Sequence, residues 1–140
     1  MKSIFVSLFI FFSVAVGVCR MDTPANCTYE DIRGIWLFEE SDRIQSRKEN
    51  CDGFRTGSHR VYFKLDFPNV ATDVHGNAGK WTIIYNQGFE VTINYRKYFA
   101  FSQYKNVGQN VISYCNSTSA GWSHDLLGNN WACVKVRGED

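Results

Sequence analysis

The sequence has little of several features that mark other classes of protein. Its net charge is only +1, from 15 basic and 14 acidic residues among 140, so no excess of basic charge favours a nucleic-acid partner. It has only 2 prolines, and its 44% hydrophobic and 16% aromatic content excludes a disordered chain. The length suits one domain with at most a short appendage, large enough to bury a core.

No apolar run is long enough to cross a bilayer, which takes about 20 helical residues. The longest run, Ile4–Val18, has 15 residues and follows the positive charge of Lys2 at the extreme N-terminus. This pattern predicts a cleaved secretory signal peptide over residues 1–21 rather than a buried helix or a membrane anchor. The remaining residues, 22–140, are then one exported domain.

The cleavage point of this signal peptide has two candidates. Cleavage after Cys19 places small residues at both −3 and −1, whereas cleavage after Met21, a poor residue at −1, makes Asp22 the first residue. Removal of residues 1–21 takes away two of the 15 basic residues and one of the 5 cysteines. The mature chain therefore carries a net charge of −1 and an even number of cysteines.

Four cysteines in an exported chain predict two disulfides. Cys27, Cys51, Cys115 and Cys133 lie too far apart in sequence to match a zinc-binding pattern. They allow three pairings, and their spacing does not choose among them. Two sequons, Asn26-Cys27-Thr28 and Asn116-Ser117-Thr118, predict N-glycans on Asn26 and Asn116, which would mark both positions as solvent-facing.

Apolar residues recur with a period of two along most of the mature chain. Residues 60–67, 81–85 and 89–95 alternate apolar and polar side chains, which is typical of half-buried strands. Aromatic and β-branched content also favours strands over residues 35–38, 98–104, 111–115 and 131–136.

Turn signals separate several of these predicted strands. Asn86-Gln87-Gly88 predicts an antiparallel hairpin, and further turns are expected near Gly76–Gly79 and at Gly108. Helix signals are nearly absent, and the polar stretch 39–50 has no apolar stripe, so we expect an exposed loop there. The sequence predicts an all-β antiparallel fold, a barrel in preference to a sandwich.

Residues with catalytic chemistry are few. His59, His75 and His124 share no metal-ligand spacing, so no metal site is expected. His124-Asp125 could be read as a general-base pair, but adjacent residues on a strand face opposite sides, which favours a structural histidine. No unpaired thiol, G-x-S-x-G elbow or nucleotide-binding loop accompanies it.

The sequence is also rich in tryptophan. Three roles are open for Trp36, Trp81, Trp122 and Trp131: core packing, a docking face for another protein, or the lining of a ligand pocket.

Four runs of sequence resemble one known family. Asp22–Tyr29, Trp81–Glu90, Ser113–Asn116 and Gly121–Cys133 are similar to the N-terminal exclusion domain of dipeptidyl peptidase I, or cathepsin C, and the resemblance covers nearly all of residues 22–136. It implies an up-and-down antiparallel β-barrel with disulfides Cys27–Cys115 and Cys51–Cys133. Both sequons fall at glycan positions of the family, and a third is lost here because Asp52 follows Asn50-Cys51.

The resemblance also implies a function. In the family, the exclusion domain blocks the cleft of a papain-like domain beyond the second substrate pocket, so that only dipeptides at a free N-terminus are released. Asp22 matches the acid that binds the α-amino group of the substrate. Arg20 and Met21 could obstruct the cleft if they preceded it.

The family implies further properties of the complete enzyme. It is a tetrameric lysosomal hydrolase, and its catalytic Cys, His and Asn, and the tyrosines of its chloride site, lie in a domain outside these 140 residues. We therefore expect this chain alone to be proteolytically inert, with papain-like catalytic chains and peptide N-termini as partners. The alternative is a free-standing secreted barrel that binds or inhibits cysteine proteases or takes a small ligand.

Overall fold

The computed structural model describes residues 23–45 and 50–139, so the predicted signal peptide and Asp22 lie outside the described residues. Within the described part, one helical turn precedes nine strands. They are α2 (Tyr29–Ile32), β1 (Gly34–Glu40), β2 (His59–Asp66), β3 (Val70–Thr72), β4 (Ala78–Ile84), β5 (Gly88–Ile93), β6 (Arg96–Val107), β7 (Asn110–Thr118), β8 (Gly121–Asp125) and β9 (Trp131–Glu139). The prediction of an all-β fold is confirmed.

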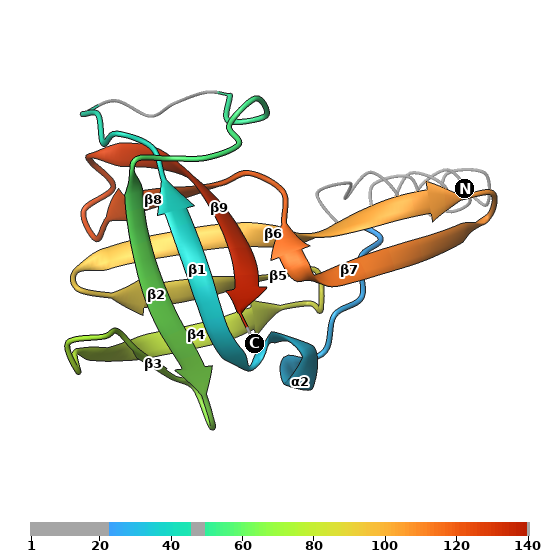
Figure 1. Cartoon of the computed structure of the whole chain (residues 1–140), viewed down its shortest axis with the longest axis horizontal. Helices are drawn as coiled ribbons and strands as arrows, with labels where there is room; N and C mark the ends of the chain where they lie inside the picture. Colours follow the sequence, from blue (N-terminus) through green and yellow to red (C-terminus); the bar gives the residue numbers. More distant parts are fainter. Residues whose placement is uncertain (1–22, 46–49, 140) are drawn as a thin grey trace, which may run out of the picture.

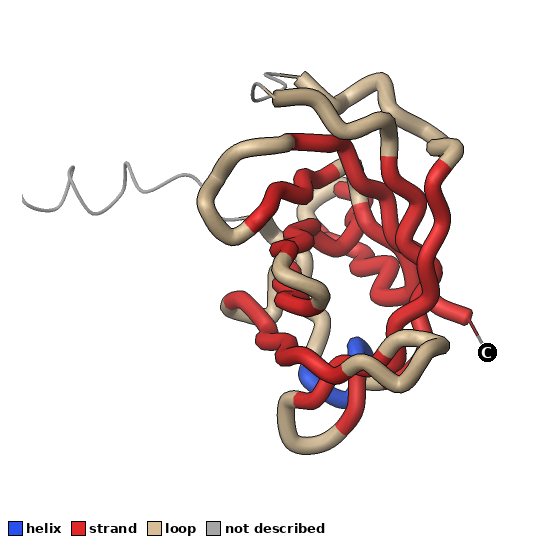
Figure 2. The backbone as a smooth tube through the Cα atoms, turned by 90° about the vertical axis from the view of Figure 1, so that its left-hand side faces the viewer, coloured by secondary structure: helices blue, strands red, loops and turns tan. Residues whose placement is uncertain are grey.

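Eight of these strands close an antiparallel barrel, as predicted. Each strand from β1 to β6 pairs with its successor, β8 then pairs with β6, and β9 joins β8 to β1. In Figure 2 the strands surround a central space. The buried side chains of the core fill this space. The exception to the sequential order is β7, which pairs with the second half of β6 and extends with it away from the barrel (Figure 1).

The core of the barrel is built from the alternate apolar residues of the strands. Phe38 packs at its centre, with ring centroids 4.9 Å from Phe63 and 5.4 Å from Tyr98. The predicted hairpin forms between β4 and β5, and Asn86 in its turn has φ +60°. Positive φ at Gly108, +59°, likewise turns β6 into β7, so the turn predicted there is confirmed.

A short N-terminal helix covers one end of the barrel. The backbone N–H of Thr28 donates to Asp31 Oδ2 over 2.9 Å, which caps α2. Ile32 is fully buried in the core, and its carbonyl accepts the indole N–H of Trp36 at 2.6 Å. The lower end of the barrel in Figure 1 is therefore fixed to the segment that precedes β1.

The prediction of an exposed loop over residues 39–50 is wrong at its first two residues. Strand β1 continues through Glu39 and Glu40, and both side chains are buried. Glu40 points into the barrel, where its carboxylate accepts the Arg96 Nε–H at 3.0 Å. A charge that looks solvent-exposed in the sequence is stable here because an oppositely charged group from a distant strand meets it.

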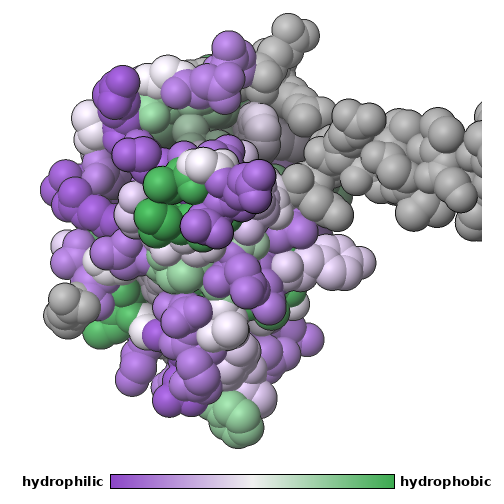
Figure 3. Space-filling model, turned by 90° about the vertical axis from the view of Figure 1, so that its right-hand side faces the viewer, coloured by the Kyte–Doolittle hydropathy of each residue, from purple (hydrophilic) through white to green (hydrophobic). Residues whose placement is uncertain are grey.

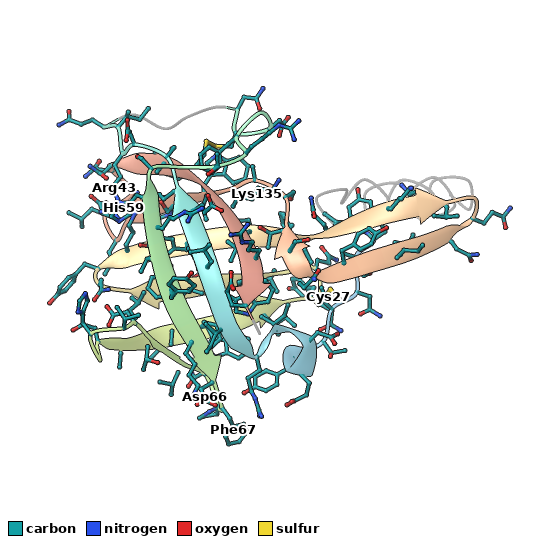
Figure 4. All side chains as sticks on the ribbon, viewed as in Figure 1. Cys27, Arg43, His59, Asp66, Phe67 and Lys135 are labelled. Atoms are coloured by element: carbon teal, nitrogen blue, oxygen red, sulfur yellow. A yellow bond between two sulfur atoms is a disulfide. The ribbon has the colours of Figure 1, made fainter. Side chains whose placement is uncertain are left out.

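Arg96 is the centre of a polar cluster inside the barrel. Its guanidinium also donates to Ser123 Oγ at 2.9 Å and to Asn130 Oδ1 at 3.0 Å. Arg43 binds the other carboxylate oxygen of Glu40 at 3.0 Å. Burial, reinforced by the negative charge of Glu40, raises the pKa of the neighbouring Tyr98 to about 12. These bonds fix the barrel end that carries Arg43 and His59 (Figure 4).

Candidate functional site

The most prominent feature outside the barrel is the hairpin formed by residues 103–114, which we call the arm. Its two strands are paired from Gln103↔Tyr114 to Val107↔Asn110. The register shifts between Ser102 and Gln103, where β7 leaves the barrel. Two strands alone are marginally stable in water. We therefore expect contact with another molecule to stabilise the arm.

The end of the arm exposes apolar side chains. Val107, Val111 and Ile112 are 46%, 40% and 45% exposed. In Figure 3, which faces the arm, hydrophobic side chains form small patches among hydrophilic ones. Exposed β-branched residues on an open hairpin are typical of a surface that a partner covers.

The N-terminal segment, residues 23–27, is fastened to the base of this arm. The disulfide Cys27–Cys115 joins it to β7 (Figure 4), and the N–H of Asn26 donates to Ser113 Oγ at 2.9 Å. The first described residue, Thr23, is also bound, because its backbone N–H donates to Gln87 Oε1 at 3.1 Å. The residue that precedes Thr23 is Asp22.

Both disulfides have the pairing that the family resemblance implies. Cys27 bonds Cys115 and Cys51 bonds Cys133, so the two other pairings are excluded. The first connects the N-terminal segment to the arm. The second holds the connection between β1 and β2 against β9 at the opposite end of the barrel. Two such crosslinks are typical of an exported protein.

The two sequon asparagines are both exposed, as an N-glycan requires. Asn26 lies beside the arm, where its Oδ1 accepts Asn86 Nδ2 at 3.2 Å. Asn116 lies on β7, beyond the arm. Glycosylation of Asn26 and Asn116 stays a prediction.

The three histidines come from different parts of the fold: His59 begins β2, His75 lies between β3 and β4, and His124 lies on β8. His124 Nδ1 lies 2.6 Å from the backbone oxygen of Asp125, and its ring packs on Trp131 with centroids 4.3 Å apart. The Asp125 carboxylate instead accepts the N–H groups of Leu127 and Asn129 at 3.1 and 2.9 Å. The His124 ring and the Asp125 carboxylate therefore bind different groups, which favours the structural reading of this pair.

Two features are absent from the described residues, a metal-binding cluster and a membrane-spanning helix. Within residues 23–45 and 50–139, no group of three His, Cys, Asp or Glu side chains could hold a metal ion. No helix in that same part of the chain is long and apolar enough to cross a membrane.

The four tryptophans divide into two groups. Trp36 and Trp81 are core residues, and the indole of Trp81 donates to the Asp66 carbonyl at 2.9 Å and stacks on Tyr29. Trp122 and Trp131 are half-buried on the outside of the barrel. The core role is thus confirmed for two of the four, and the other two lie on the surface.

The molecule is thus a disulfide-linked antiparallel β-barrel, with an arm and a tethered N-terminal segment as its candidate site. Comparison with known proteins defines it further. The chain belongs to the Cathepsin C exclusion domain family, whose model matches residues 22–137. A curated relative, Cathepsin C from Schistosoma mansoni, is 45% identical over 106 residues. That match covers 76% of this chain but 22% of the relative, so this chain spans a minor part of the relative's length.

Proposed function

We propose that this chain is the domain that converts a papain-like cysteine protease into a dipeptidyl peptidase. The observation that carries the proposal is the tether between the N-terminal segment and the base of the arm. The arm projects from the barrel and can lie across one end of a substrate cleft. In this proposal Asp22, which precedes the tethered segment, acts at the same end of the cleft.

Asp22 supplies the recognition chemistry in this proposal. The α-amine of a peptide has a pKa near 8, so it is cationic at acidic lysosomal pH. A carboxylate at the closed end of a cleft binds this ammonium through charge-assisted hydrogen bonds. An acetylated or internal peptide has no such charge and is rejected. Cleavage of the signal peptide after Met21 gives Asp22 the free position that this role needs.

In this proposal the catalytic residues of the enzyme belong to a partner, the papain-like catalytic chain. The papain-like catalytic chain supplies the reactive Cys, His and Asn, and the complete enzyme binds chloride through that chain. We propose the secretory pathway and the lysosome as its location, and a tetramer as the assembled form. The disulfides and the sequons support an oxidising, exported environment.

A chimera tests the role of Asp22. It is the schistosome Cathepsin C with its matched region replaced by residues 22–137 of this chain. We expect Asp22→Asn to lower kcat/KM for a free-amine dipeptide substrate by about 10- to 150-fold, because a hydrogen bond to a charged group contributes about 1.5–3 kcal/mol. Asp42→Asn, in the connection after β1 at the far end of the barrel, is the matched control. Equal activity of the two variants would contradict the assignment.

A further inference from the structure

A second surface lies on the outer face of the barrel, separate from the N-terminal tether. Its lining includes five aromatic rings, which we call the aromatic groove: Phe99, Phe101, Trp122, His124 and Trp131. The groove encloses about 540 Å³ and is open to solvent on one side. No residue in it takes part in the site proposed above.

Strand pairing explains why these rings meet. Phe99 lies opposite Trp122 across β6 and β8, and His124 lies opposite Trp131 across β8 and β9. Side chains directly opposite each other share a face of an antiparallel sheet. The intervening Tyr98 is buried in the core, so the aromatic set points outward.

The outer face of β2 shows what this barrel exposes elsewhere. There the outward residues are Arg60, Tyr62 and Lys64, and all three are exposed to solvent. The aromatic groove instead gathers rings that are only half-buried. An apolar concentration of this kind marks a binding surface.

Charged side chains line the edge of the groove. Glu90 Oε1 lies 3.6 Å from Lys97 Nζ, and the Lys97 side chain is 44% exposed. An apolar centre with a polar, hydrated rim is the usual arrangement of a protein–protein interface, in which Trp and Phe are enriched.

The groove is continuous with the arm. Strand β6 extends from Arg96 to Val107, and its register with β7 shifts between Ser102 and Gln103. The alternation of buried and outward residues along β6 continues through this shift, so Gln103 follows Phe99 and Phe101 on the outward side. On the arm, Gln103 shares its face with Tyr114, whereas Ser113, which binds the N-terminal segment, belongs to the opposite face. One side of β6 therefore carries a surface from the groove to the arm.

We infer that the aromatic groove is the second contact surface for the catalytic part of the same enzyme, which presents apolar side chains to it. This inference rests on the proposed function. It follows from the continuity of the groove with the arm and from the length of the relative, of which 22% is matched by this chain. A partner that covers the arm on this side reaches the groove along β6.

Hydroxyl-radical footprinting tests the inference, because aromatic side chains react strongly. The 140-residue chain is compared with the chimera that contains residues 22–137. We expect oxidation of Phe99, Phe101 and Trp122 to fall at least about fivefold in the chimera, as for residues desolvated at an interface centre. Tyr62 on β2, 44% exposed, is the aromatic control outside the groove and the arm, and should react equally in both proteins.

Tyr104 and Tyr114 in the arm distinguish the possible failures. Protection of these two residues without protection of the groove refutes the groove inference and leaves the proposed function intact. Protection of neither surface contradicts both. Groove protection in the isolated chain that disappears on dilution assigns the groove to a second copy of this chain, which also overturns the inference. As a variant test, Trp122→Thr should lower the Tm of the chimera more than that of the isolated chain, whereas Tyr62→Thr should lower both equally.

Discussion

The two disulfides offer a matched pair of perturbations that separates stability from function. Cys27–Cys115 spans 88 residues and Cys51–Cys133 spans 82. In the chain-entropy model each crosslink stabilises the fold by about 4.5 kcal/mol, and the difference in loop length changes this by under about 0.1 kcal/mol. Removing either disulfide should therefore cost nearly the same free energy of unfolding.

The loss of enzymatic activity in the chimera should differ between the two disulfide variants. Cys27→Ala with Cys115→Ala removes the covalent link between the N-terminal segment and the arm. Hydrogen bonds then hold the segment, among them those of Thr23 and Asn26 and the bond from the residue 27 N–H to the Asn86 carbonyl at 2.7 Å. Cys51→Ala with Cys133→Ala leaves this tether untouched. In the chimera, we expect the first pair to lower kcat/KM for a free-amine dipeptide substrate by about 10- to 100-fold more than the second, the effect of misplacing a binding group by about 1 Å.

Urea unfolding of the isolated chain and steady-state kinetics of the chimera supply the two measurements. The stability values act as the internal control, because an activity loss caused by unfolding would follow them. Equal losses of activity for two variants of equal stability would refute the claim that the tether positions the substrate-binding acid.

Two further predictions concern the stability of the barrel. Arg96→Met leaves Glu40 buried without its main partner and should lower the free energy of unfolding in urea by about 3–5 kcal/mol. Combining it with Glu40→Leu should recover most of that loss. A double variant as unstable as Arg96→Met alone would contradict the stabilising role of this buried pair. The hydrogen bond from Thr56, followed by the charges of Arg60 and Arg137, holds the pKa of Glu39 below its ordinary 4.5, and this outweighs the opposing effect of burial. A lowered folded-state pKa contributes stability that is present above pH 4.5 and is lost as the pH falls through the folded value. Thr56→Val should therefore cost about 1.5–3 kcal/mol at pH 7 and distinctly less at pH 3, and an equal cost at both pH values would count against it.

The strands that were predictable from the sequence are those with long alternating patterns. Residues 60–67 correspond to β2, and residues 89–95 to β5, because each strand buries one face in the same core. Strand β3 was not predicted because three residues are too few to show a period. Strand β8, Gly121–Asp125, contains Gly, Ser and Asp, which are poor strand formers, and its place depends on pairing with β6 and β9.

The candidate site was predictable only in part, because its components meet through long-range contacts. The sequence places Cys27 near the N-terminus but gives no sign that it bonds Cys115, 88 residues later, at the base of the arm; the family resemblance implies that pairing. Glu40 was read as exposed because its partner Arg96 is 56 residues away. The aromatic groove likewise requires three strands to be in register.

The central claim is that this domain turns a protease into an enzyme that acts only at free N-termini. The most direct measurement is mass spectrometry of the products that the chimera forms from one peptide, with its N-terminus free or acetylated. We predict successive dipeptides from the free peptide and none from the acetylated one, and internal fragments from both once residues 103–114 of the arm are replaced by a short turn. Internal cleavage of the acetylated peptide by the intact chimera would contradict the account.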